Sequence, residues 1–150
     1  MEDAKKVIKV IKGHQLSIYS KIQSKKGLTQ FDEILEVSDG IIIGRGYLGL
    51  SLDEIEDVVF VQTYIINKCN AVGKPVILQT HILESMISRL RPTRSEVCDI
   101  AHAVEEGIDA MILTAETATG PFFAEAIAHM SKIFFETEAN LEYVKKYQKQ

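Results

Sequence analysis

Asp39-Gly40-Ile41-Ile42-Ile43-Gly44 predicts a short β-strand, because a wholly apolar, β-branched run lies there between two glycines. Such runs are typical of strands buried on both faces. Two further apolar runs, Val76-Ile77-Leu78 and Asp109-Ala110-Met111-Ile112-Leu113, predict strands of the same kind. Another strand is expected at residues 16–22, where apolar and polar side chains alternate.

Helical periodicity alternates with these strands. Apolar side chains recur at helical spacing in residues 4–11, 31–37, 55–69, 97–104 and 121–134, before a polar, Lys-rich tail. The order is one helix followed by four strand–helix pairs, which is typical of right-handed βαβ units around a parallel sheet. The fold class is therefore α/β. The spacing fits an open doubly wound sheet and a (β/α)₈ barrel equally well.

Start and stop signals support the helix boundaries. Thr93-Arg94-Ser95-Glu96 matches the capping box, and Gly107 is placed to end the helix that follows it. Ser51 or Asp53 is available to cap the preceding long helix, and Gly73 to end it.

One segment after a strand, Gly44-Arg45-Gly46-Tyr47-Leu48-Gly49, matches the G-x-G-x-x-G pattern of dinucleotide-binding turns. That pattern also needs an acidic residue at the end of the next strand, about 20 residues on. Here the next strand is more than about 30 residues away and ends in Gln79-Thr80. We therefore interpret the match as incidental.

Composition excludes several classes of function. The 150 residues include 17 Lys+Arg and 21 Asp+Glu, for a net charge of −4, with no strongly basic patch for nucleic acid. No apolar run approaches the length of a membrane span, and Met1-Glu2-Asp3-Ala4 lacks the apolar core of a secretory signal. We expect a cytoplasmic protein that binds neither nucleic acid nor membrane. Cys69 and Cys98 are expected to be small core residues, because no metal-ligand spacing involves them.

Polar residues follow each predicted strand, where ligands bind in parallel βα folds. The four clusters are Lys21-Ile22-Gln23, Gly44–Gly49, Gln79-Thr80-His81 and Thr114-Ala115-Glu116-Thr117-Ala118. Together they predict a site for an oxyanion, because a lysine, glycine backbone N–H groups and threonine hydroxyls all suit one. Taken singly, Lys21 also fits a solvated side chain, Thr80 a helix cap and Glu116 a carboxylate in the first turn of a helix.

Several longer motifs closely resemble pyruvate kinase, in that family's order and spacing. They are Phe31-Asp32-Glu33-Ile34-Leu35, Ser38-Asp39-Gly40-Ile41, Gly44–Gly49, Gly73-Lys74-Pro75-Val76-Ile77, Leu83-Glu84-Ser85-Met86, Arg91-Pro92-Thr93-Arg94-Ser95-Glu96 and Glu116-Thr117-Ala118. The resemblance implies that residues 1–150 form half of a TIM (β/α)₈ barrel, its fifth to eighth strands with their helices. It includes neither the family's capping domain nor its C-terminal effector domain.

Members of this family transfer a phosphoryl group from phosphoenolpyruvate to ADP in glycolysis, giving pyruvate and ATP, with Mg²⁺ or Mn²⁺ and usually K⁺. The resemblance implies a catalytic role for Lys21, which matches the lysine that stabilises charge on the transferring phosphoryl group and the enolate. Gly46 and Thr80 match residues that bind the substrate carboxylate.

The metal positions depart from the family pattern. Gln23 stands where the family has glutamate, and Tyr47 where it has aspartate, so neither metal carboxylate is retained. Because Mg²⁺ prefers charged oxygen ligands, we expect metal binding by this chain to be weak. His81 replaces the usual glutamine, and Thr114-Ala115 replaces the usual Ser-Gly.

Two functional hypotheses follow from the resemblance. In the first, the chain is pyruvate kinase-like but inactive by itself, since a closed barrel of this kind needs about 250 residues. In the second, it is a catalytically dead remnant or interaction module that binds intact pyruvate kinase subunits, or a second copy of itself. Arg91 and Arg94 resemble the family's subunit interface and are the candidate contact residues.

Overall fold

The computed structural model describes Val10 and residues 16–148, and side chains as far as Leu141. The helix predicted at residues 4–11 lies outside the described residues except for Val10. The chain is α/β with parallel strands, which confirms the predicted fold class. It divides into two compact units between Gln79 and Thr80, and each is described by itself.

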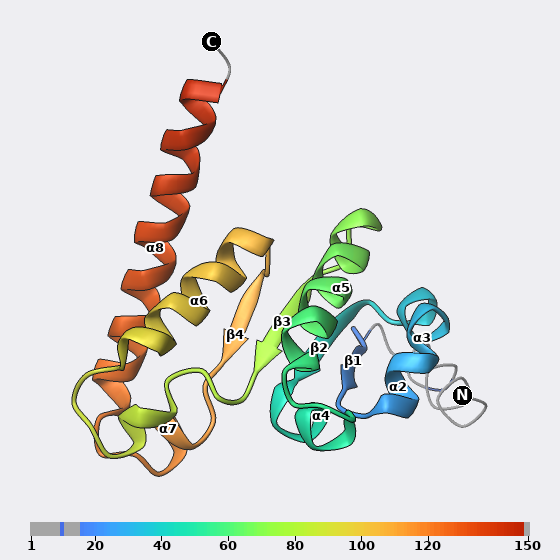
Figure 1. Ribbon diagram of the computed structural model, residues 1–150, viewed down its shortest axis with the longest axis horizontal. Coiled ribbons are helices and arrows are strands. Elements are labelled where there is room, and N and C mark those ends of the chain that lie inside the picture. The colour runs from blue at the N-terminus through green and yellow to red at the C-terminus, as the bar shows by residue number, and fades with distance from the viewer. Residues whose placement is uncertain (1–9, 11–15, 149–150) are drawn as a thin grey trace. The chain divides into compact units, whose positions relative to one another are not determined.

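The first unit contains three parallel strands. These are β1 (Tyr19–Ile22), β2 (Gly40–Gly44) and β3 (Val76–Gln79), in that spatial order (Figure 1). Lys21 pairs with Ile42 across β1 and β2, and Gly44 pairs with Gln79 across β2 and β3. All three strands were predicted, and the observed β1 is shorter than residues 16–22.

The predicted burial of the central strand on both faces is wrong. On the face toward the helices, Ile41, Ile43, Val76 and Leu78 have no exposed surface. The alternate residues, such as Ile42 and Ile77, point to the opposite face and are only half-buried. An apolar run does not reveal this asymmetry, because isoleucine occupies both faces.

Four helices accompany these strands. They are α2 (Lys25–Thr29), α3 (Phe31–Val37), α4 (Arg45–Ser51) and α5 (Asp57–Ala71), and α5 packs against β2 and β3 (Figure 1). The helices α3 and α5 were predicted. The short helices α2 and α4 were not, because Gly27, Gly46 and Gly49 lower helix propensity within them.

The predicted side-chain cap of the long helix is wrong. The N-cap residue of α5 is Glu56, which makes no capping side-chain hydrogen bond. Ser51 instead donates to the Leu48 carbonyl and accepts from the Lys25 N–H, while Asp53 forms an ion pair with Lys25. Both candidate caps therefore end α4 and connect it to α2.

The second unit is mainly helical. Its elements are η2 (Glu84–Ile87), α6 (Arg94–Glu106), β4 (Ala110–Ile112), α7 (Ala115–Ala118) and α8 (Phe123–Gln148). Figure 1 shows α6 beside the long α8, and α7 contacts both α8 and η2. The capping box of Thr93 and Glu96 is confirmed, as is the stop at Gly107, whose φ is 94°. The predicted polar tail is the continuation of α8.

The two cysteines have different environments. Cys69 is buried in α5, as predicted, but Cys98 is exposed on α6, so its prediction is wrong. The buried residues of α6 are Ile100, Ala103 and Val104. Cys98 is two residues from Ile100, and two helical steps of about 100° place it on the other side of the helix.

No helix in the described part of the chain combines the length and the apolar composition needed to cross a membrane. This finding includes α8, whose 26 residues make it the longest helix given above.

Gly120 allows a close backbone approach in the second unit. A Cβ atom at this position would lie 2.7 Å from the Glu116 carbonyl oxygen and 3.3 Å from Cα of Ile87. Because both neighbours are backbone atoms, we expect Gly120→Ala to destabilise the protein by about 1–3 kcal/mol. Urea unfolding followed by circular dichroism measures this change.

The matched control is Gly27→Ala, whose added Cβ would have only ordinary contacts of 3.5 Å or more. Alanine favours a helix over glycine, so this control should be neutral or stabilising. Equal unfolding midpoints for the two variants would contradict the assignment of Gly120 to a sterically closed position.

Candidate functional site

Two side chains from the end of β1 converge over the last residue of β2. Lys21 lies in β1, Gln23 comes directly after this strand, and both side chains are exposed. A Cβ atom at Gly44 would lie 2.7 Å from Cε of Lys21 and 3.5 Å from Oε1 of Gln23. Both side chains thus use space that glycine leaves free. Gly44 also pairs with Gln79, which places an ammonium group and two amide side chains at the carboxyl ends of neighbouring strands.

The helix α4 begins directly after Gly44. Gly46 is half-buried in its first turn, whereas the neighbouring Tyr47 is 68% exposed. Arg45 is only 9% exposed, and its Nη1 lies 3.5 Å from Oε1 of the buried Gln62 in α5. This buried pair helps to fix α4 against α5, and thereby the backbone at Gly46.

The backbone immediately after β3 is strained. Thr80 and His81 have φ values of 70° and 54°, in the left-handed region. A β-branched residue is rare there, and such a conformation costs about 1–3 kcal/mol. Nε2 of His81 lies 3.7 Å from Oε2 of Glu84, and both side chains are exposed. Strain of this kind is often found at binding sites, so Thr80 remains a candidate binding residue.

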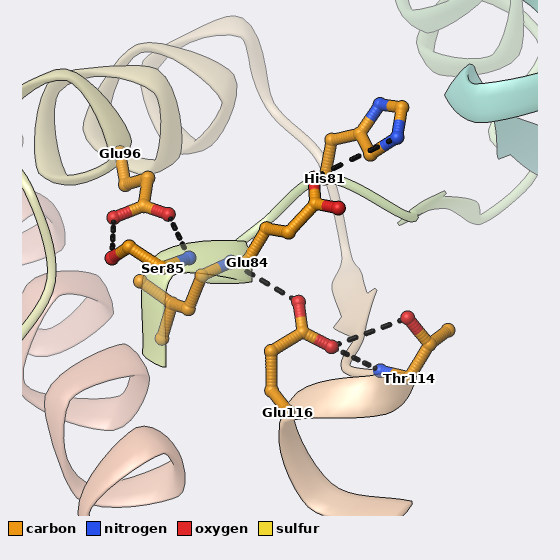
Figure 2. A network of polar contacts seen from close by, with 7 residues as sticks. His81, Glu84, Ser85, Glu96, Thr114 and Glu116 are labelled. Atoms are coloured by element: carbon orange, nitrogen blue, oxygen red, sulfur yellow. Dashed lines mark hydrogen bonds and ion pairs between the residues drawn. The ribbon is translucent and has the colours of Figure 1, made fainter. Parts of the chain in front are cut away.

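Figure 2 shows two carboxylates that serve as structural acceptors in the second unit. Glu116 is 1% exposed, in the first turn of α7. Its Oε1 accepts from the Leu83 N–H at 3.3 Å, and its Oε2 accepts from the N–H and hydroxyl of Thr114 at 2.7 and 3.2 Å. Its observed role is to join the segment before η2 to the start of α7. The predicted position in the first turn of a helix is confirmed.

Glu96 is the second acceptor, and it extends the capping box to a neighbouring segment. Its Oε1 accepts from the Ser85 N–H at 2.8 Å, and its Oε2 from the Ser85 hydroxyl at 2.6 Å. Its Oε2 also accepts from the N–H and hydroxyl of Thr93, at 2.7 and 2.8 Å. Partial burial acts to raise the pKa of Glu96, but the hydrogen bonds from Ser85 and Thr93 outweigh it, so the pKa is lowered.

The candidate interface arginines are both exposed. Arg91 lies in the connection between η2 and α6, and Arg94 is the first residue of α6. The nearby Leu90 is 51% exposed, so this connection presents both charge and apolar surface. Neither arginine takes part in the hydrogen bonds of Glu96.

Comparison with known proteins decides the family. A family model described as "Pyruvate kinase, barrel domain" matches residues 1–127. The chain belongs to the pyruvate kinase family. It is 45% identical over 141 residues to the pyruvate kinase of Clostridium acetobutylicum, which covers 94% of this chain and 30% of that protein. It is 47% identical over 144 residues to that of Thermotoga maritima, covering 95% of this chain and 31% of the relative. It is 48% identical over 127 residues to "Pyruvate kinase PKLR" of Homo sapiens, covering 85% and 22%.

The chain spans less than a third of each of these pyruvate kinases. Within this span, the three positions with roles implied by the resemblance all lie near strand ends. Lys21 is the next-to-last residue of β1, Gly46 is in the first turn of α4 after β2, and Thr80 follows β3 directly. Lys21 and Gly46 belong to the first unit, and Thr80 begins the second.

The pyruvate kinase resemblance implies a divalent metal, and the donors present here do not fit one. Gln23 offers a neutral amide, and Tyr47 offers a bulky phenol in place of a carboxylate, on a side chain that is 68% exposed. Mg²⁺ prefers charged oxygen ligands in an octahedral arrangement. Among the described residues, no group of three or more His, Cys, Asp or Glu side chains is placed to hold a metal ion.

Sequence reasoning missed two features of these regions. The contact of Lys21 and Gln23 over Gly44 joins residues of different strands, and only the register of β1 and β2 reveals it. The bonds from Ser85 to Glu96 were also missed, because the capping box predicts contacts with Thr93 alone.

Glu96 generates a prediction about acid stability. Because its pKa is lower in the folded protein, its hydrogen bonds stabilise the fold at pH values above the unfolded pKa, about 4.3. This contribution is lost as the pH falls through the lower folded pKa. We expect Glu96→Gln to destabilise the protein at pH 7 and to flatten the loss of stability below about pH 4.

Urea unfolding at a series of pH values from 7 to 3 provides the measurement. Glu105→Gln is the control, because Glu105 is an exposed residue of the same helix. If the wild type and Glu96→Gln lose stability with the same slope in acid, the network of Glu96 does not contribute as described.

Proposed function

We propose that this chain contributes part of a phosphoenolpyruvate site of the pyruvate kinase type but does not support Mg²⁺-dependent phosphoryl transfer. The polar strand ends of the first unit support the first part. Lys21 is exposed at a strand end and forms no ion pair with any residue that the structure describes. Its charge is therefore available to an anion.

Each retained residue has a proposed role in that site. Lys21 stabilises negative charge on the phosphoryl group and the enolate. The family resemblance implies carboxylate binding for the backbone at Gly46 in the first unit and for the Thr80 hydroxyl in the second, and each role is proposed within its own unit. The strained conformation of Thr80 supports this role, since such strain is maintained where a binding site requires it. ADP and K⁺ belong to the proposal through the family resemblance alone.

One observation carries the second part. The neutral amide of Gln23 lies against Gly44 together with the stem of Lys21, at a position where the family resemblance implies a metal carboxylate. A bound Mg²⁺ supplies charge neutralisation to a transferring phosphoryl group. With Gln23 and Tyr47 in place, this chain provides no charged ligand at either position.

The proposal is tested by restoring both carboxylates. Gln23→Glu combined with Tyr47→Asp should increase Mn²⁺ affinity at least tenfold, measured by electron paramagnetic resonance of the free ion. Ala124→Asp combined with Ser131→Glu adds the same charge at two other exposed positions and should leave Mn²⁺ binding unchanged. An unchanged Mn²⁺ affinity in the restored variant, or tight Mn²⁺ binding by the wild type, would contradict the proposal.

The reverse changes test the same idea in a relative. In a pyruvate kinase that has the glutamate and aspartate of the family pattern at these two positions, changing them to glutamine and tyrosine should lower kcat by at least a factor of about 1,000, because both proposed metal ligands are removed. Retention of kcat within tenfold would show that these positions do not control metal-dependent transfer.

A second candidate function is association with intact pyruvate kinase subunits. The exposure of Arg91 and Arg94, next to the half-exposed Leu90, favours it. The tagged chain should capture purified Thermotoga maritima pyruvate kinase, and Arg91→Glu with Arg94→Glu should reduce capture at least fivefold by reversing the charge. Lys132→Glu, an exposed change on α8, is the control. Capture that is absent, or equal in all variants, would contradict this function.

A further inference from the structure

The end of β1 presents hydrogen-bond donors at a position where the family resemblance implies a carboxylate that binds a metal ion. A glutamate side chain offers only acceptors when ionised, whereas the Gln23 amide carries two N–H donors. Lys21 adds three donors and a positive charge. An ammonium group next to an amide has the donor character that binds an oxyanion directly, and it has no attraction for a cation.

The sheet holds these two side chains together. Residues 21 and 23 point to the same face of β1, because successive strand side chains alternate. Gly44 lies between β1 and Gln79. A Cβ atom at Gly44 would be 2.7 Å from Cε of Lys21 and 3.5 Å from Oε1 of Gln23, so glycine leaves room for both side chains. Both side chains therefore meet over the backbone of Gly44, on the sheet face opposite to the buried Ile41 and Ile43.

The charges near this point favour an anion. The connection after α4 carries Asp53, but its carboxylate is 2.5 Å from Nζ of Lys25 and is neutralised by it. Asp39 lies at the opposite end of β2, where it accepts from the Ile18 N–H at 2.7 Å. Neither carboxylate pairs with Lys21. These two carboxylates therefore do not compensate the charge of Lys21.

We propose that Lys21 and Gln23 bind a phosphate group directly, without a divalent metal ion. A lysine recognises phosphate as a point charge, and a doubly charged phosphate attracts it more strongly than a singly charged carboxylate does. The Gln23 amide donates to a phosphate oxygen that a metal ion would otherwise contact. This inference rests on the proposed function for the location of the site, and it reverses the expected metal dependence of ligand binding there.

The experiment titrates the whole chain with inorganic phosphate in the presence of EDTA, followed by amide chemical shifts in ¹⁵N–¹H spectra. Shifts should concentrate at residues 20–24 and 43–46, and 5 mM Mg²⁺ in place of EDTA should not strengthen binding. Lys21→Met should weaken binding at least tenfold, and Gln23→Glu should weaken it by a similar factor, because a carboxylate repels phosphate. Both residues are exposed, so the variants should fold.

Lys26→Met is the matched control, since it removes one positive charge from an exposed position in α2 of the same unit. It should bind phosphate as the wild type does. Pyruvate, which has a carboxylate and no phosphate, should leave the amide shifts of residues 20–24 unchanged. Binding that requires Mg²⁺, equal losses in Lys21→Met and Lys26→Met, absence of phosphate binding, or equal shifts of residues 20–24 with pyruvate would each overturn the inference.

The Mn²⁺ and phosphate experiments together distinguish failure of this inference from failure of the proposed function. If the restored Gln23→Glu and Tyr47→Asp variant gains no Mn²⁺ affinity while the wild type binds phosphate in EDTA, only the metal argument fails. If that variant gains Mn²⁺ affinity while the wild type binds no phosphate, only the direct phosphate contact fails.

Discussion

Burial of one face of the parallel sheet is the constraint on which the first unit depends. Ile41, Ile43, Val76 and Leu78 are fully buried beneath the helices. Because side chains alternate along a strand, this burial places Lys21, Gln23 and Gly44 on the other face. A register shift of one residue in β1 would move Lys21 toward the apolar face, at a large cost in free energy. The hydrophobic core therefore fixes the position of the candidate binding residues.

The second unit depends on hydrogen-bonded carboxylates as well as on apolar packing. Glu96 holds Ser85 beside the start of α6, and Glu116 holds the backbone at Leu83 beside Thr114 (Figure 2). In the described part of the chain, every buried side-chain nitrogen or oxygen has a hydrogen-bond partner. Unpaired buried acceptors are costly, so these networks restrict the segments that connect η2, α6 and α7.

Gln23 and Tyr47 stand where the family resemblance implies carboxylates, and neither residue belongs to the buried core of the fold. Both side chains are exposed, so neither contributes to the buried face of the sheet or to the packing of α4. The chain is accordingly a clear member of the pyruvate kinase family while its donor set differs from the one that the family resemblance implies. Fold and chemistry are separable here because they use opposite faces of the same strands.

The sequence by itself determined the α/β class, the existence of β2 and β3, the capping box of α6 and the family, because each depends on local periodicity or on contiguous motifs. It also placed Lys21, Gly46 and Thr80 close to strand ends. Only the tertiary structure decided which side chains meet. The convergence of Lys21 and Gln23 over Gly44, the bonds of Ser85 to Glu96 and the exposure of Cys98 all depend on strand register or on helix rotation. These are set by packing between segments distant in sequence, which a local pattern does not contain.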